Sequence, residues 1–168
     1  MAELTLSDKL QPCLLDRLTD DEPDKEQEGR SSRVMSMQKY RRAVVRDLTW
    51  LLNTHANAVQ SGYDEYDEIP SSVLNFGVQN IAGKTSSSLS IEEMRYQLRE
   101  ALRRFEPRIL PNTISIVMNM NPDEMSNRSL RFGIQGDLWA EPIPETLFIK
   151  TELDLETGKG NLGWGSGG

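Results

Sequence analysis

Residues 113–120 (TISIVMNM), 130–138 (LRFGIQGDL) and 147–155 (LFIKTELDL) decide the fold, because apolar and polar residues alternate in all three. A period of two is typical of β-strands, whose successive side chains point to opposite faces of a sheet. The pattern predicts one face packed on a core and one face turned to solvent.

The segments that follow these strands have turn-forming sequences. Residues 121–124 (NPDE) and 156–160 (ETGKG) each predict a turn between neighbouring strands. Residues 161–164 (NLGW) predict a short fourth strand, and the tail 165–168 (GSGG) is expected to be disordered. The second half of the chain is therefore predicted to be an antiparallel meander.

The first half has a helical period instead. Between Met35 and Asn53, apolar residues recur at steps of three and four, which predicts an amphipathic helix. These residues are Tyr40, Val44, Leu48, Leu51 and Leu52. Residues 71–81 (SSVLNFGVQNI) predict a short helix followed by a turn at Gly77, and residues 82–90 predict a loop.

A further helix is predicted from Ser90 onward. Ser90 and Glu93 have the spacing of a capping box, in which the two side chains satisfy free N–H groups of the first turn. An apolar stripe follows, and Pro107 ends the helix because proline disfavours helical geometry at the preceding residue. The stripe consists of Ile91, Met94, Leu98, Leu102 and Phe105.

The order of these elements predicts an α+β fold. Two to three N-terminal helices would pack on one face of a small, mostly antiparallel sheet of three to four strands. Residues 1–30 are predicted to form an N-terminal arm, with Leu10, Leu14, Leu15 and Leu18 in a brief helix, followed by an acidic linker. Residues 31–164 would form a single domain.

Composition narrows the class of protein. The chain has 168 residues and a formal net charge of −7, so binding a nucleic acid by bulk charge is not expected. No apolar run approaches the roughly 20 residues that span a bilayer, and the first residues lack a signal-peptide pattern. We therefore expect a cytoplasmic protein without direct membrane insertion, cofactor, metal or small-molecule substrate.

The sequence contains no Gly-rich phosphate loop, no nucleophile elbow and no Cys/His metal cluster. Cys13 and His55 are the only Cys/His couple, and structural or surface roles are expected for both. Glycoside hydrolysis needs only two suitably placed carboxylates. Glu106 together with an acid of the 64–68 loop (Asp64, Glu65, Asp67 or Glu68) therefore leaves a peptidoglycan hydrolase as the alternative function.

The triplet Glu106-Pro107-Arg108 stands out at the end of the second long helix. If this segment is extended, the carboxylate and the guanidinium point to the same side on a rigid elbow. The pair either binds a partner or merely clips the helix end as an intramolecular ion pair. A stripe of arginines on the same helix is either a solvated face or a surface for an acidic partner. The stripe consists of Arg95, Arg99, Arg103 and Arg104.

Four segments occur in an order that resembles a known family, the TssE baseplate subunits of bacterial type VI secretion systems. They are LLDRLTDDEP (14–23), VRDLTWLLNT (45–54), SVLNFG (72–77) and FEPRI (105–109). TssE is in turn similar to the small wedge protein at the base of the sheath in contractile phage tails. With the alternating strands included, the resemblance covers nearly all of residues 10–164.

The resemblance implies a non-catalytic structural subunit, located in the cytoplasm within a baseplate docked at the inner-membrane complex. The implied partners are the TssF, TssG and TssK wedge subunits and the TssB–TssC sheath, whose polymerisation the subunit would help to start. It also implies that Glu106, Pro107 and Arg108 contact the wedge core. A free-standing binding module for another acidic protein remains a further alternative.

Overall fold

The computed structural model describes most of the predicted domain and part of the arm. The described residues are 10, 12–20, 23–24, 35–57, 66–82, 90–118, 129–140 and 144–164. The turn predicted at 121–124, most of the loop 82–90, most of the acidic linker, Asp64, Glu65 and the tail 165–168 lie outside these residues. The boundary at residue 30 lies outside them as well and stays a prediction.

The C-terminal half forms a four-stranded antiparallel meander in the order β1-β2-β3-β4, as the alternation predicts. The strands are β1 (Ser115–Met118), β2 (Ser129–Leu138), β3 (Glu145–Asp154) and β4 (Gly160–Trp164). Every second residue of β2 and β3 is buried, and the polar residues between them face the other side of the sheet.

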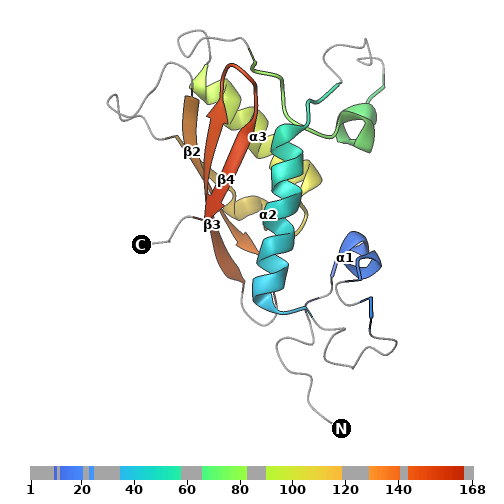
Figure 1. Cartoon of the computed structure of the whole chain (residues 1–168). Helices are drawn as coiled ribbons and strands as arrows, with labels where there is room; N and C mark the ends of the chain where they lie inside the picture. Colours follow the sequence, from blue (N-terminus) through green and yellow to red (C-terminus); the bar gives the residue numbers. More distant parts are fainter. Residues whose placement is uncertain are drawn as a thin grey trace.

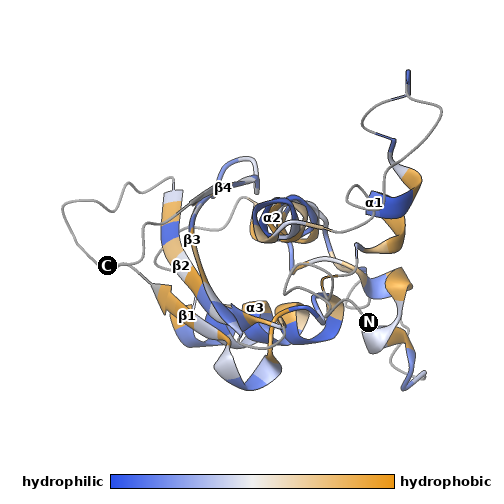
Figure 2. Cartoon of the chain, turned by 90° about the horizontal axis from the view of Figure 1, so that it is seen from below, coloured by the Kyte–Doolittle hydropathy of each residue, from blue (hydrophilic) through white to orange (hydrophobic). Residues whose placement is uncertain are grey.

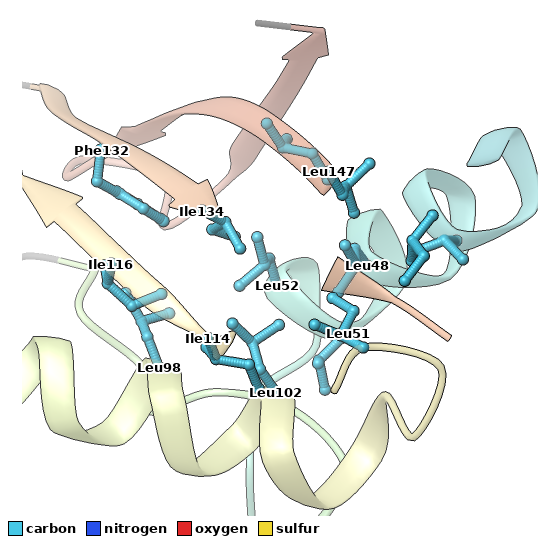
Figure 3. Close-up of a cluster of buried hydrophobic side chains, with 14 of the residues drawn as sticks. Leu48, Leu51, Leu52, Leu98, Leu102, Ile114, Ile116, Phe132, Ile134 and Leu147 are labelled. Carbon is cyan, nitrogen blue, oxygen red and sulfur yellow. The ribbon is translucent and has the colours of Figure 1, made fainter. Parts of the chain in front are cut away.

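Two long helices pack against one face of the curved sheet (Figures 1 and 2). Helix α2 (Met37–Asn53) lies beside β4, and α3 (Ile91–Phe105) lies beside β1. The predicted apolar stripe of α2 is buried throughout. Figure 3 shows how leucines of both helices meet isoleucines of β1 and β2 in one core; the labelled members include Leu48, Leu52, Leu102, Ile116 and Ile134.

Local interactions fix where the long helices begin and end. Ser90 Oγ accepts a hydrogen bond from the Glu93 amide at 3.3 Å, which confirms the Ser90 half of the predicted capping box. The Asn53 side chain exchanges two hydrogen bonds with the Gly160 backbone, at 2.9 and 3.0 Å. The last turn of α2 is thereby joined to the first residue of β4.

Segment 72–77 is bound to the end of α2. It contains the short 3-10 helix η5 (Val73–Asn75), after η4 (Ile69–Ser71), and then turns at Gly77, which has a φ of 131°. Val78 N donates to Thr54 O, and Ala56 N donates to Val78 O, both at 2.9 Å. A predicted short helix and turn are therefore both present.

The arm contains a helix of five residues, α1 (Leu14–Leu18), at the predicted position. Leu10 is buried, whereas the three leucines of α1 are exposed, so the helix presents its apolar side to solvent. The remaining short element, the 3-10 helix η7 (Pro111–Thr113), leads from α3 into β1. None of the helices within the described ranges is long and apolar enough to cross a membrane.

Candidate protein-docking site

The elbow after α3 is a tight turn. The helix ends at Phe105, and the Ile109 amide donates to Glu106 O at 3.2 Å, so Pro107 and Arg108 occupy the two middle positions. The segment is therefore not extended, which was the condition of the sequence argument. The expected result still holds, because the turn brings the Glu106 and Arg108 side chains together.

Arg108 binds Glu106 through two parallel hydrogen bonds. Its Nε donates to Oε1 and its Nη2 donates to Oε2, each at 2.6 Å, and the Arg108 amide also donates to Oε1 at 3.2 Å. This fork geometry is the strongest arrangement of a guanidinium with a carboxylate. The Glu106 side chain is only 2% exposed and that of Arg108 17%, so the pair is largely removed from water.

The same guanidinium reaches the helix α2. Arg108 Nη2 donates to Asp47 Oδ2 at 2.6 Å. Asp47 Oδ1 accepts from Arg46 Nε at 2.8 Å, and Arg46 Nη1 donates to Asp16 Oδ1 of α1 at 2.7 Å. Five alternating charges therefore connect the arm, α2 and the elbow; we call them the charge chain. Its members are Asp16, Arg46, Asp47, Arg108 and Glu106.

Both arginines of the charge chain stay charged. Burial lowers the pKa of Arg108, but the carboxylates of Glu106 and Asp47 outweigh it and raise that pKa above its ordinary value. Hydrogen bonds from Arg46 to Asp47 and Asp16 likewise raise the pKa of Arg46. The Arg46 guanidinium also lies over the Trp50 ring, 5.2 Å from its centroid.

Backbone contacts anchor the elbow to the end of β2. Arg108 O accepts from Trp139 N, and Leu110 N donates to Asp137 O, both at 2.8 Å. Ile109 and Leu138 form an isolated antiparallel bridge between these two contacts. The elbow is thus fixed to the sheet by main-chain hydrogen bonds and to α2 by charge.

The exposed part of the elbow is Pro107. Its side chain is exposed, Arg108 is half-buried and Glu106 is enclosed. Both Glu106 oxygens are occupied by Arg108, so this residue offers no free carboxylate to a sugar substrate. The geometry therefore does not favour Glu106 as the acid of a hydrolase.

The other residues singled out in the sequence lie elsewhere. Cys13 donates to Asp16 Oδ2 at 2.9 Å, whereas His55 is exposed and pairs through its backbone with Val78. The arginine stripe of α3 is mostly neutralised: Arg95 pairs with Glu92, and both Arg103 and Arg104 pair with Glu100. This pairing is typical of a solvated helix face.

Arg46, Asp47 and Asp16 were not predicted as site residues. Two of the four segments that carry the TssE resemblance, residues 45–54 and 14–23, contain all three. Nothing in the sequence pattern of these segments shows that Asp47 contacts Arg108. The signal available in the sequence was the adjacent pair Arg46 and Asp47 on the polar side of an amphipathic helix.

Fold and site together define a class: a small α+β domain whose sheet and helices hold a rigid, charge-clamped elbow at the surface. The family model of the baseplate wedge protein gp25 matches residues 38–143, well over half of the chain. The protein therefore belongs to the baseplate wedge protein gp25 family, which includes TssE, and this confirms the predicted family. Searches of curated proteins and of solved structures gave no match.

Membership of this family supports a structural role in a phage-tail-like baseplate. The matched region contains α2 except its first residue, together with α3, β1, β2 and the whole elbow. The charge chain is also inside it, except for Asp16 on the arm.

Proposed function

We propose that this protein is a non-catalytic wedge subunit of a type VI secretion baseplate, which links the wedge to the contractile sheath and helps to start sheath polymerisation. Its proposed partners are TssF, TssG and TssK in the wedge and TssB–TssC in the sheath. The family match supports the baseplate role, and the four TssE-like segments favour the secretion machine. The proposed place of action is the cytoplasm, in a baseplate docked at the inner-membrane complex.

The observation that carries the docking part of the proposal is the exposed Pro107 on a clamped turn. A surface that is already rigid loses little conformational entropy on binding. Glu106 is enclosed, so its proposed role is to hold Arg108, while Pro107 and the accessible part of Arg108 contact the wedge core. In this proposal the ion pair both closes the end of α3 and holds the docking surface, so the two interpretations of the triplet do not exclude each other.

The decisive variant must block the elbow without breaking the ion pair. Pro107→Trp adds bulk at the exposed corner and leaves the Glu106, Arg108 and Asp47 side chains in place. A matched control is Lys159→Trp, because Lys159 is exposed on the turn between β3 and β4, at the opposite end of β3 from the elbow contacts. Thermal unfolding of both variants shows whether each is folded.

Co-purification with TssF and TssG from the same organism is the test. We expect wild type and Lys159→Trp to associate stably, and Pro107→Trp to lose most of its binding while its melting temperature stays near that of wild type. Binding that survives in Pro107→Trp would remove the elbow from the interface. No binding by folded wild type would overturn the wedge role itself.

The sheath part of the proposal rests on the sheet edges. Within the described residues, β1 pairs only with β2 and β4 pairs only with β3, so the outer edge of each has no partner strand. On the β4 edge, the Gly160 backbone is bonded by the Asn53 side chain. An incoming sheath strand can pair with such an edge. Deleting the protein should abolish fluorescent TssB–TssC sheaths in cells without changing TssB and TssC levels; normal sheaths in its absence would overturn the initiation role.

A further inference from the structure

The sheet face turned away from α2 and α3 contains a hollow of about 660 Å³. It crosses all four strands, and its walls include the side chains of Val117 on β1 and Phe148 on β3. Val117 is half exposed, and Phe148 is partly buried. The volume is in the range of sites that bind small molecules or side chains.

Two glycines make the floor of the hollow. The strand register places Gly133 of β2, Lys150 of β3 and Gly163 of β4 in one row across the sheet, with Lys150 between the two glycines. A Cβ on Gly133 would lie 3.1 Å from the Phe148 ring, so this glycine is already covered by an aromatic side chain. Gly163 is open, because the nearest atom to its built Cβ is Lys150 O at 3.9 Å.

Among the described residues that line the hollow, one cation is left without an acidic partner. Arg131 pairs with Glu152 at 3.1 Å, directly across the β2–β3 ladder. Lys150 is exposed, and no carboxylate in the described part of the chain pairs with it. A lysine ammonium next to apolar walls and an uncovered glycine favours a ligand that is apolar and acidic at once.

We propose that this hollow binds a peptide segment of a partner protein, with an aromatic side chain over Gly163 and a neighbouring carboxylate on Lys150. Aromatic rings stabilise sheet glycines by covering the exposed backbone, as Phe148 does for Gly133. The partner ring would do the same for Gly163. The apolar contact supplies most of the affinity, since an exposed ion pair adds little, and the charge selects acidic segments.

This site is separate from the elbow. The elbow contacts the end of β2 and helix α2, whereas the hollow lies on the uncovered sheet face. The inference therefore does not depend on the proposed secretion machine, and its test uses the purified full chain alone.

Three blocked tripeptides separate the contributions of ring and charge. They are acetyl-Asp-Phe-Asp-amide, acetyl-Asp-Ala-Asp-amide and acetyl-Lys-Phe-Lys-amide, titrated into the isotope-labelled full chain and followed by amide NMR shifts. We expect saturable shifts at Gly163 and Lys150 with the first peptide. The other two peptides should bind at least about fivefold more weakly. Equal shifts with all three peptides, or none with the first, would overturn the proposal.

Two variants and a control complete the test. Gly163→Val fills the open floor with a residue that suits a strand, and it should weaken binding of the Asp-Phe-Asp peptide about fivefold or more. Lys150→Glu should reverse the preference toward the Lys-Phe-Lys peptide. Lys159→Glu makes the same charge change outside the hollow and should leave binding unchanged. Binding that ignores Lys150→Glu and Gly163→Val, or that falls equally in Lys159→Glu, would overturn the site.

Discussion

Arg108 Nη2 lies 2.6 Å from Asp47 Oδ2, although the two residues are 61 positions apart in the sequence. The same nitrogen lies 2.6 Å from Glu106 Oε2. One guanidinium therefore joins the end of α3 to the middle of α2. It also fixes the turn in which the exposed Pro107 lies between Glu106 and Arg108. The charge chain is part of the fold as well as part of the proposed docking site.

Removing Arg108 should destabilise the protein. Arg108→Ala leaves the enclosed Glu106 carboxylate without its partner, and we expect the free energy of unfolding to fall by about 3–5 kcal/mol. Denaturant unfolding monitored by circular dichroism measures this change. A loss of wedge binding in this variant alone would therefore not distinguish docking from folding, which is why the elbow is better tested at Pro107.

The control for Arg108→Ala is Arg103→Ala. Arg103 is 61% exposed and pairs with Glu100 at 3.5 Å, so its loss should change the unfolding free energy by no more than about 0.5 kcal/mol. If Arg108→Ala were as mild as this control, the Glu106 carboxylate would have to be hydrated or held by another group. The clamp would then not be the structural cause of the rigid elbow.

The attachment of the arm should depend on pH. Burial raises the pKa of Asp16, but hydrogen bonds from Cys13 and Arg46 outweigh it, and the net pKa lies below its usual value of 3.8. A carboxyl whose pKa is lowered by folding stabilises the native state above its unfolded pKa, and this contribution disappears as the pH falls through the native pKa.

Asp16→Asn tests this prediction. At pH 7 we expect a loss of about 1 kcal/mol, the usual size for a hydrogen-bonded charge with a partly exposed partner. Urea unfolding from pH 7 to pH 3 should show the difference between variant and wild type shrinking below pH 3.8. A difference that stays constant over this range would mean that the carboxylate charge is not what holds α1.

Alternation and helical period in the sequence predicted the elements correctly, because they report directly which side chains are buried. The four strands, the two long helices, the Ser90 cap and the stop at Pro107 all follow from local chemistry. The conformation of the elbow does not follow from the sequence pattern, because an i to i+3 turn also places Glu106 beside Arg108. Spacing alone does not distinguish that turn from an extended segment.

Contacts between distant segments could not be predicted in the same way. Whether Asp47 meets Arg108 depends on how α2 lies against the elbow, and the sequence pattern gives no such angle. The row of Gly133, Lys150 and Gly163 depends on the register of two strand pairs. A slip of one residue would move each side chain to the other face of the sheet and remove the hollow.

Gly77 gives the clearest physical reason for one of the TssE-like segments. It lies at φ 131°, and a Cβ there would be 2.4 Å from Thr54 O, a backbone atom that already accepts from Val78 N. Gly77→Ala should therefore separate segment 72–77 from the end of α2 and cost about 3 kcal/mol or more in unfolding free energy.

Gly158→Ala is the matched control for this last variant. Gly158 has a φ of 69°, and its built Cβ would lie 3.3 Å from the side chain of Ala82 and clear of backbone atoms. The left-handed backbone opposes the new methyl group by about 1–2 kcal/mol, and the tight contact with Ala82 adds to this cost. Equal losses in the two variants would show that backbone conformation alone explains both glycines. A larger loss at Gly77 is expected from its stricter φ of 131° together with the close approach to Thr54.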